Sequence, residues 1–365
     1  ILFATPYNDL AGGINQWAKH IISHYKKIES DVEIELMPMN SHQTIDPTIA
    51  HKSTYRRITN GVLTYSKVIK NLKTILAKSS FDILHIASSA SISLIKDYLM
   101  IKNAKKQGVK TALHFHFGRI PELAKKNNWE WKLLTKVVKM SDVAIVIDQA
   151  SYNTLLKYGY KNIALLPNPL APRIESLIEQ HKDIKKIKGR IVFVGHCIVT
   201  KGVYELVKAC KNIDNIELRL IGPIRDDVKA DLISISGGQE WLKIQGKQPF
   251  EEVIKEMASC NVFALPTYTE GFPNVIIESM ACGCPIVTTS VGAIPEMLDL
   301  NGDAPCGVCV EVKNIEELKN SIKFIIENPA FANEISVRAK QRVTDLYRIN
   351  KVWSKLVDIW HSCLH

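Results

Sequence analysis

The sequence lacks several features that would place it in a special class of protein. No cysteine lies before position 190, and no internal repeat or low-complexity tract is present. No apolar run approaches the roughly 18 residues that cross a membrane. These absences exclude a repeat architecture, and they exclude a disulfide framework for the first half of the chain. The first residues, ILFATPYNDL, show no basic leader and no small-residue cleavage site, so we expect a strand there rather than a secretory signal.

Metal-ligand patterns are also scarce. Of the 8 cysteines, only Cys282 with Cys284 and Cys306 with Cys309 lie close together. A lone Cys-x-x-Cys without a second pair or a histidine partner is a poor zinc ligand set. Most of the other cysteines fall in apolar patterns, where a free cysteine behaves as a small hydrophobic residue. The sequence therefore predicts no metal site and a reducing, cytoplasmic location.

Positive charge is concentrated in the first half. The 365 residues are enough for two domains and carry a formal net charge of +10. Residues 1–170 contain 23 basic and 12 acidic side chains, so the whole excess lies there. This asymmetry predicts an anionic partner, which could be a membrane surface, a lipid diphosphate or nucleic acid; the alternative is a solvated lysine-rich surface. Nucleic acid is not expected, because no binding motif is present.

One basic segment stands out, residues 51–78, which has no acidic residue. Its basic residues include Arg56, Arg57, Lys67, Lys70, Lys73 and Lys78. The segment reads as a helix with too many apolar residues for a narrow stripe, so one face must pack on the domain. We hypothesise that the basic face rests on the inner face of the cytoplasmic membrane, as a peripheral contact. The alternative is a solvated cover helix that contacts no membrane.

Short apolar strands alternate with helical patterns along most of the chain. The expected strands are residues 1–5, 32–37, 81–87, 109–115, 142–147, 162–167, 190–195, 216–222, 241–246, 261–266, 285–289 and 307–310. The expected helices of the first half are residues 14–28, 53–78, 92–107, 127–140 and 149–158. This order predicts an α/β protein with two Rossmann-like, doubly wound parallel sheets. Only helical patterns follow residue 313.

Three prolines in LLPNPLAPR, residues 165–173, interrupt the alternation and predict the linker between the domains. We therefore expect an N-terminal domain over residues 1–168 and a C-terminal domain over residues 169–345. Residues 346–365 would form a C-terminal helix that packs back toward the N-terminal domain. Ligands of such sheets bind beyond the carboxyl ends of the strands, so two facing domains would form a cleft between them.

Two glycine loops follow expected strands. In RIVFVGHCIVTKG, Gly195 allows close backbone approach, and Lys201 stands at a helix start where amides favour an anion. His196 lies at the strand end and could reach the same anion. In YNDLAGGINQW, Gly12 and Gly13 precede a helix in the same way. Neither loop has a Walker or dinucleotide-binding pattern, and the alternative for each is an ordinary strand-to-helix turn.

The stretch EGFPNVIIE places two glutamates, Glu270 and Glu278, eight residues apart around a predicted helix start. Pro273 suits the first helical position. The amides around this start, at Gly271, Phe272, Asn274 and Val275, would bind a phosphate or sugar oxygen. Carboxylates accept hydrogen bonds from vicinal hydroxyls, so the pair predicts an extended ligand with a sugar at one end and a ribose at the other. The alternatives are a surface glutamate and a helix-terminal charge.

In the first half, VKTALHFHFGR carries the polar groups of a strand end. His114 and His116 are two residues apart and would share one face of the strand. Arg119 follows at the same strand end. A lone histidine beside a strand is usually structural, but two at one strand end favour a functional role.

Taken together, these motifs resemble the retaining glycosyltransferases of family 4, with the GT-B fold. The likeness rests on the spacing of Glu270 and Glu278, on VGHCIVTKG and on the linker PNP. It implies that Lys201 binds the donor diphosphate, that Glu278 holds the ribose and that Glu270 holds the transferred sugar. It also implies that His114 lies near the reacting carbon, with His116 as the alternative. His196 departs from the family, in which an arginine is usual.

The resemblance implies a transferase that moves a sugar from a nucleotide-sugar, by default a UDP-sugar, to a glycan or lipid-linked acceptor. Transfer would retain the anomeric configuration and use no cofactor, and no Asp-x-Asp metal motif is present. His114, Glu270 and Lys201 would be the catalytic residues, and His116 and Arg119 would bind the acceptor. Two alternatives stay open: a sugar-nucleotide epimerase of the same fold, and a non-catalytic partner subunit that binds the donor.

Overall fold

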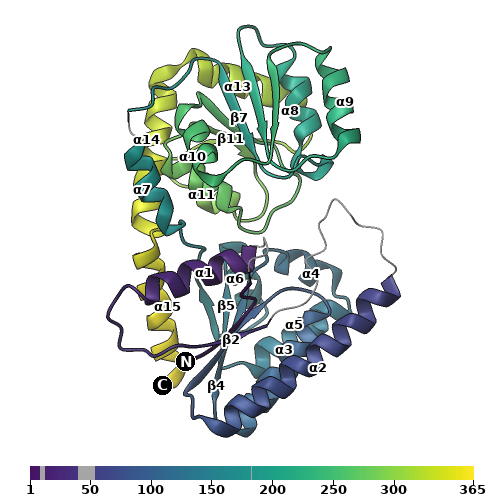
Figure 1. The fold of residues 1–365 in the computed structure, drawn as a ribbon, viewed down its shortest axis with the longest axis vertical. Coiled ribbons are helices and arrows are strands. Elements are labelled where there is room, and N and C mark those ends of the chain that lie inside the picture. Colours follow the sequence, from purple (N-terminus) through teal and green to yellow (C-terminus); the bar gives the residue numbers. More distant parts are fainter. Residues whose placement is uncertain (9–12, 40–53, 182) are drawn as a thin grey trace. The chain divides into compact units, whose positions relative to one another are not determined.

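The computed structural model describes residues 1–8, 13–39, 54–181 and 183–365, and for residues 54–64 it describes the backbone alone. The chain divides into two compact units (Figure 1). Unit 1 contains Ile1–Pro169 together with Ile349–His365, and unit 2 contains Leu170–Arg348. The last helix, α15 (Ile349–Leu364), therefore belongs to unit 1 although it follows unit 2 in the sequence.

Unit 1 is built on a six-stranded sheet in the order β2-β1-β3-β4-β5-β6, in which every pair is parallel. The strands are β1 (Leu2–Thr5), β2 (Glu35–Pro38), β3 (Ile83–Ser88), β4 (Lys110–Phe115), β5 (Val143–Val146) and β6 (Ile163–Leu165). β1 lies between β2 and β3, so after β2 the chain crosses to the other side of β1 to form β3. The loops that follow β1 and β3 therefore diverge at this point of the sheet.

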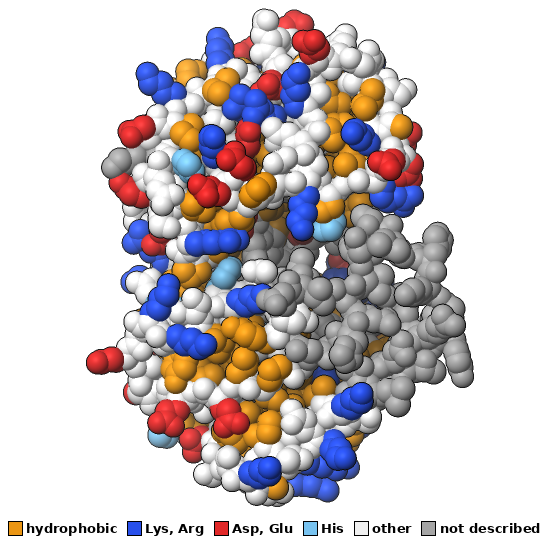
Figure 2. Space-filling model, viewed as in Figure 1, with side chains coloured by type: hydrophobic (Ala, Val, Ile, Leu, Met, Phe, Trp, Pro, Cys, Tyr) orange, Lys and Arg blue, Asp and Glu red, His pale blue; other side chains and the backbone are white. Residues whose placement is uncertain are grey.

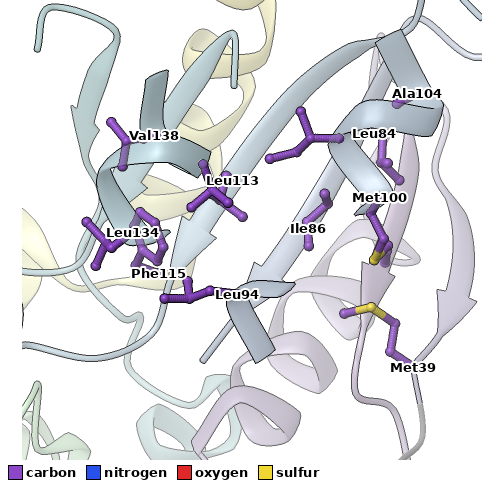
Figure 3. Close-up of a cluster of buried hydrophobic side chains, with 14 of the residues drawn as sticks. Met39, Leu84, Ile86, Leu94, Met100, Ala104, Leu113, Phe115, Leu134 and Val138 are labelled. Carbon is purple, nitrogen blue, oxygen red and sulfur yellow. The ribbon is translucent and has the colours of Figure 1, made fainter. Parts of the chain in front are cut away.

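Helices cover both faces of this sheet because side chains of each strand alternate between the faces. In β1, Phe3 packs with Trp17 of α1 (Gly13–Tyr25) and with Trp360 of α15. Its neighbours Leu2 and Ala4 pack in the other cluster. That cluster is covered by α2 (Thr54–Lys78), α3 (Ser93–Lys106), α4 (Ile120–Lys126) and α5 (Trp129–Met140). Figure 3 shows side chains of α3 and α5 packed on those of β3 and β4.

Unit 2 repeats the plan with the order β12-β11-β10-β7-β8-β9, again all parallel. Its strands are β7 (Arg190–Val194), β8 (Glu217–Ile221), β9 (Leu242–Gly246), β10 (Val262–Leu265), β11 (Ile286–Thr289) and β12 (Val308–Val310). Its helices include α7 (Pro172–Gln180), α8 (Val203–Cys210), α9 (Asp226–Ser236), α10 (Phe250–Ser259), α11 (Asn274–Ala281), α13 (Ile315–Glu327) and α14 (Pro329–Leu346). The strand order reverses at β7, which lies between β10 and β8.

The predicted pair of doubly wound α/β sheets is confirmed, and each of the twelve expected strands lies within a few residues of its observed position. Pro38 ends the edge strand β2, where a missing N–H costs no ladder bond. The helix expected over 127–140 begins later, at Trp129, and is preceded by α4. The sequence did not predict α4, because its seven residues are too few to show a helical period.

Among the described residues, no helix combines the length and the hydrophobicity needed to cross a membrane. None of the eight cysteines forms a disulfide, and all but Cys309 are buried. The described part of the chain also contains no group of three side chains suited to hold a metal ion.

Candidate functional site

The predicted donor residues of unit 2 lie around the point where the strand order reverses. Gly195 and His196 directly follow β7, and Glu270 follows β10, the neighbour of β7. β8 lies on the other side of β7. At such a switch point the loops after adjacent strands separate and leave room for a ligand beyond the carboxyl ends.

Gly202 allows two loops of this site to approach one another. Gly202 adopts φ +71°, and a Cβ there would lie 2.0 Å from the carbonyl oxygen of Pro266. The backbone N–H of Tyr268 donates to the Thr200 carbonyl at 2.8 Å, and the Thr267 hydroxyl donates to the same oxygen at 3.1 Å. The short helix η2 (Val199–Lys201) is therefore tied to the segment that follows β10.

This contact brings Lys201 and Glu270 together. The Lys201 ammonium donates to the Glu270 carboxylate at 2.5 Å, and the two side chains are 26% and 10% exposed. The sequence predicted that these residues bind different parts of one ligand, and it did not predict that they pair with each other. An arriving diphosphate would compete with Glu270 for the ammonium, which leaves the carboxylate able to accept from a hydroxyl.

The segment at Gly292 and Ala293 packs against the turn between Glu270 and α11. A Cβ at Gly292, which has φ +59°, would lie 2.3 Å from the Glu270 carbonyl oxygen, and the Ala293 N–H donates to the Gly271 carbonyl at 2.9 Å. The Phe272 side chain is buried and lies edge-on to Tyr347, with ring centroids 5.9 Å apart. Phe272 can therefore offer a ligand its backbone only.

The start of α11 differs by one position from the expectation. Pro273 is the N-cap, and Asn274 is the first helical residue. Pro273 has an extended backbone, with ψ 106°, which is favourable at a cap. Val275 then lies in the first turn, where backbone amides have no carbonyl one turn earlier. This turn presents the positive end of the helix dipole beside Glu270.

Glu278 lies one turn further along α11 and is half-buried. Burial raises the pKa of its carboxyl group to about 7, although the positive charge of Arg173 on α7 opposes this shift. Arg173 was not predicted as a site residue. Its guanidinium stacks over the Phe250 ring, 3.7 Å from the centroid. The only sequence signal was its place at the end of the proline-rich linker.

Tyr268 and His196 complete this part of the site. Burial and a hydrogen bond to Glu205 raise the pKa of Tyr268 to about 12, and the Lys313 ammonium lies 4.9 Å from its ring centroid. These contacts were missed by sequence reasoning because they join distant segments. His196 is half-buried, and its Nδ1 has no hydrogen-bond partner among the described residues.

In unit 1 the two predicted histidines lie together. His114 is fully buried on β4, and its ring centroid is 4.0 Å from that of the half-buried His116. Trp17 of α1 packs against both rings. A third histidine, His85 on β3, lies 5.5 Å from His114 by ring centroids. Its position in ILHIAS, two strand positions from Ala87, is the period-two signal that could have placed it on this face.

The electrostatics of the three histidines favour neutral rings. Burial lowers the pKa of His85 and of His116 to about 3 each, and it lowers the pKa of His114 well below its usual value, with a further contribution from His116. Neither ring nitrogen of His114 has a hydrogen-bond partner among the described residues. At neutral pH these side chains can donate or accept a hydrogen bond but carry no charge.

The positions of the other predicted residues of unit 1 do not by themselves indicate a ligand site. Gly12 lies outside the described residues. Gly13 begins α1 and is exposed, and a Cβ there would meet no atom within 4 Å. Arg119 is the N-cap residue of α4, and its guanidinium lies 3.4 Å from the Glu130 carboxylate. The structure therefore gives Arg119 a partner within unit 1.

Comparison with known protein families gives two matches that together span most of the chain. Residues 175–342 match the family described as glycosyl transferases group 1. Residues 11–173 match the family described as glycosyltransferase family 4. The boundary between the matches falls at the end of the proline-rich segment predicted as the linker.

Individual relatives have low sequence identity to this chain, but the alignments cover most of both chains. An uncharacterized glycosyltransferase of Methanocaldococcus jannaschii is 23% identical over 350 residues, which cover 93% of this chain and 92% of the relative. The N-acetyl-alpha-D-glucosaminyl L-malate synthase of Bacillus anthracis is 23% identical and covers 69% of this chain and 74% of its own.

Among solved structures, the Anabaena protein HepE in complex with UDP aligns with a TM-score of 0.70 at 15% identity, over 99% of each chain. Sucrose-phosphate synthase from Thermosynechococcus elongatus aligns with a TM-score of 0.74 at 16% identity, over 99% of this chain and 98% of its own. At these identities the likeness concerns the fold, and it confirms the predicted GT-B architecture.

Proposed function

Because this chain belongs to the group 1 and family 4 glycosyltransferases, we propose that it transfers a sugar from a UDP-sugar to a glycan or lipid-linked acceptor. The transfer would retain the anomeric configuration and use no metal ion. The product would belong to a cell-surface polysaccharide or glycolipid. Separate observations support the donor, the reaction and the acceptor.

The observation that carries the proposal is the Lys201–Glu270 pair beside the first turn of α11, with Glu278 on the same helix. Lys201 and the helix start offer positive charge to a diphosphate. The two carboxylates offer acceptors to hydroxyl groups. Glu270 precedes α11 and Glu278 lies inside it, so the two carboxylates can bind hydroxyl groups at different points of one extended ligand, as a sugar and a ribose on either side of a diphosphate require.

The reaction follows from these contacts. As the bond to the leaving diphosphate breaks, negative charge grows on the phosphate oxygens, and Lys201 with the amides of α11 stabilises it. An oxygen of the leaving phosphate takes the proton of the incoming hydroxyl on the same face of the sugar, which accounts for retention. In this proposal the pair His114 and His116 serves the sugar as a neutral hydrogen-bonding group, with His116 the more exposed of the two, because low pKa values leave both rings without charge.

The choice of UDP is supported by relatives of the same fold. The Anabaena protein HepE has been solved with UDP, with UDP and glucose, and with UDP-glucose. The choice of a cell-envelope acceptor is supported by relatives named as a capsular polysaccharide glycosyltransferase of Staphylococcus aureus and an O-antigen mannosyltransferase of Escherichia coli.

A membrane contact would bring such an acceptor to the enzyme. On α3, the exposed side chains Ile92, Ile95 and Leu99 recur along one face of the helix and its cap. The adjacent helix α2 carries the exposed lysines Lys67, Lys70, Lys73 and Lys78. Figure 2 shows basic side chains at the lower right over α2, where those that the structure describes are lysines. We place this surface on an anionic bilayer at the inner face of the cytoplasmic membrane.

A transfer assay tests the proposed function against its alternatives. The protein is incubated with UDP-glucose, UDP-galactose and UDP-N-acetylglucosamine, with and without a glycan or polyprenyl-phosphate acceptor. A transferase releases UDP mainly when acceptor is present and yields a product of the same anomeric configuration. An epimerase acts without an acceptor. A non-catalytic donor-binding subunit is stabilised by UDP in a thermal-shift measurement but releases none.

A further inference from the structure

Unit 2 contains a pocket of about 260 Å³ whose lining includes none of the predicted donor residues. Asn261 and Pro285 line it, and they directly precede β10 and β11. Lys201 and Glu270, in contrast, follow strands. All six strands are parallel. Residues that precede the strands therefore lie at the amino ends of the sheet, and residues that follow the strands lie at the opposite, carboxyl ends. The pocket therefore lies across the sheet from the proposed donor site.

One wall of the pocket is a single stripe of α14. Pro329, Asn333, Ser336 and Lys340 recur at helical spacing and line it together. The Ser336 hydroxyl donates to the Ala332 carbonyl, so its oxygen is held in place on the wall. The remaining wall comes from the segments that lead into β7, β10 and β11.

The polar groups that line the pocket are mainly donors. Two lysines, Lys186 and Lys340, face it, and none of the ten described residues that line it is acidic. Lys186 donates from Nζ to the Cys260 carbonyl at 3.1 Å, which holds its ammonium at the rim. The Asn261 Oδ1 accepts from the Gly189 N–H at 3.1 Å, which leaves the amide NH₂ for a ligand.

Gly283 shapes the position of Lys340. It has φ +67°, and a Cβ there would lie 2.3 Å from Lys340 Cε and 2.9 Å from its Nζ. The positive φ favours glycine at this turn, and a larger residue would also displace the end of the Lys340 side chain. Cys284 is buried next to Gly283, where the charges of both lysines act on it. Burial alone would raise the pKa of its thiol, but a hydrogen bond with Cys260 and the charges of Lys186 and Lys340 lower it.

We propose that this pocket binds a small anion that carries a phosphate group. Two ammonium groups and an amide donor, with no carboxylate, match the acceptor oxygens of a phosphate. The volume lies below the roughly 300–1,000 Å³ of sites for drug-sized ligands, so it suits inorganic phosphate or a sugar phosphate rather than an intact nucleotide-sugar. The proposal does not depend on the proposed transferase reaction.

Calorimetry and thermal-shift measurements on the full chain test the proposal, with inorganic phosphate and glucose 6-phosphate as probes and sodium chloride of equal ionic strength as the reference. Both are run with and without saturating UDP. We expect saturable binding that persists with UDP. A stronger response to glucose 6-phosphate would identify a sugar phosphate, and equal responses would identify the phosphate group alone.

The variants Lys186→Met and Lys340→Met keep the apolar stem and remove the ammonium. Each should weaken anion binding by about tenfold or more, as expected for loss of a charge-assisted hydrogen bond. Lys229→Met, at an exposed site on α9 of the same unit, is the matched control and should bind as the wild type does. Binding lost in Lys201→Ala but kept in Lys340→Met would place the anion in the donor site and overturn the proposal. Equal effects of phosphate and chloride would overturn it too.

Discussion

At the scale of single residues, Glu278 shows how burial changes the acidity of a side chain. Its pKa of about 7 places its ionisation near neutral pH because burial disfavours the charge. The folded-state pKa is higher than the unfolded value, so the folded protein keeps the proton while the unfolded chain loses it. Stability therefore falls as pH rises from the unfolded value toward 7.

We predict that donor affinity falls as the pH is lowered through 7, because the protonated carboxyl group loses its charge as an acceptor for ribose hydroxyls. Glu278→Gln should weaken donor binding by roughly 10- to 100-fold, in line with hydrogen bonds to charged groups, and should flatten the pH dependence. Calorimetric titration with UDP at pH 6, 7 and 8 measures both. The same variant should be more stable than the wild type above pH 7 in urea. An unchanged donor affinity would remove Glu278 from the site.

The pairing of Lys201 with Glu270 makes their mutational effects interdependent. Lys201→Ala should raise the barrier by about 2–4 kcal/mol, as expected when a group that stabilises developing charge is lost. Glu270→Ala should lower kcat more than it lowers UDP affinity, because we place its carboxylate on the sugar. Because the two groups form an ion pair, the double variant should cost less than the sum of the single ones. Lys229→Ala is the control, and a near-wild-type rate for Lys201→Ala would contradict the assignment.

At the scale of elements, α15 is held to unit 1 by a buried polar contact. The Trp360 Nε1–H donates to His85 Nδ1 at 3.0 Å, and both side chains are fully buried. Phe3 and Trp353 pack against the same indole ring. The contact fixes the His85 tautomer with its proton on Nε2, and it joins two residues 275 positions apart.

We predict that Trp360→Phe destabilises the protein by about 1–3 kcal/mol, because His85 Nδ1 would remain buried without a donor. Urea unfolding followed by circular dichroism measures the loss. The matched control is Trp129→Phe, at a side chain that is 55% exposed, and it should change little. Combining Trp360→Phe with His85→Phe should recover part of the loss, since both partners are then apolar. If Trp360→Phe and Trp129→Phe were equally stable, the hydrogen bond would contribute nothing to stability.

At the scale of the whole molecule, the excess positive charge belongs to residues 1–170. On α2 and α3 the one acidic residue is Asp97, which is buried and paired with Lys96. The exposed charges that the structure describes on these helices are therefore all positive. The side chains of Arg56 and Arg57 lie outside the described residues, so Lys67, Lys70 and Lys73 carry the test.

We predict salt-sensitive sedimentation with vesicles that contain anionic lipid, because each basic side chain near such a surface contributes about 1 kcal/mol. Replacing Lys67, Lys70 and Lys73 by glutamine should reduce binding strongly. The matched control replaces three exposed lysines of unit 2, Lys208, Lys229 and Lys243. Ile95→Ser should weaken binding too, whereas Ile233→Ser, equally exposed on α9, should not. An absence of binding at low salt would refute the membrane contact.

The sequence by itself determined the elements and much of the candidate site. Strand positions were readable because short apolar runs between turns are local signals. Gly195, Lys201, Glu270 and Glu278 could be selected because ligands of parallel sheets bind where strands end and helices begin. The same locality explains the misses at short helices such as α4, where too few residues show a period.

Tertiary structure decided what depends on residues far apart in the chain. The Lys201–Glu270 pair joins positions 69 apart, and its geometry depends on the contact of Gly202 with Pro266. The neutral state of His114 follows from burial beside His85 and His116, and the pKa of Glu278 follows from its burial on α11 beside α7. Side-chain pairing and desolvation arise only when strands and helices pack, so no local pattern in the sequence contains them.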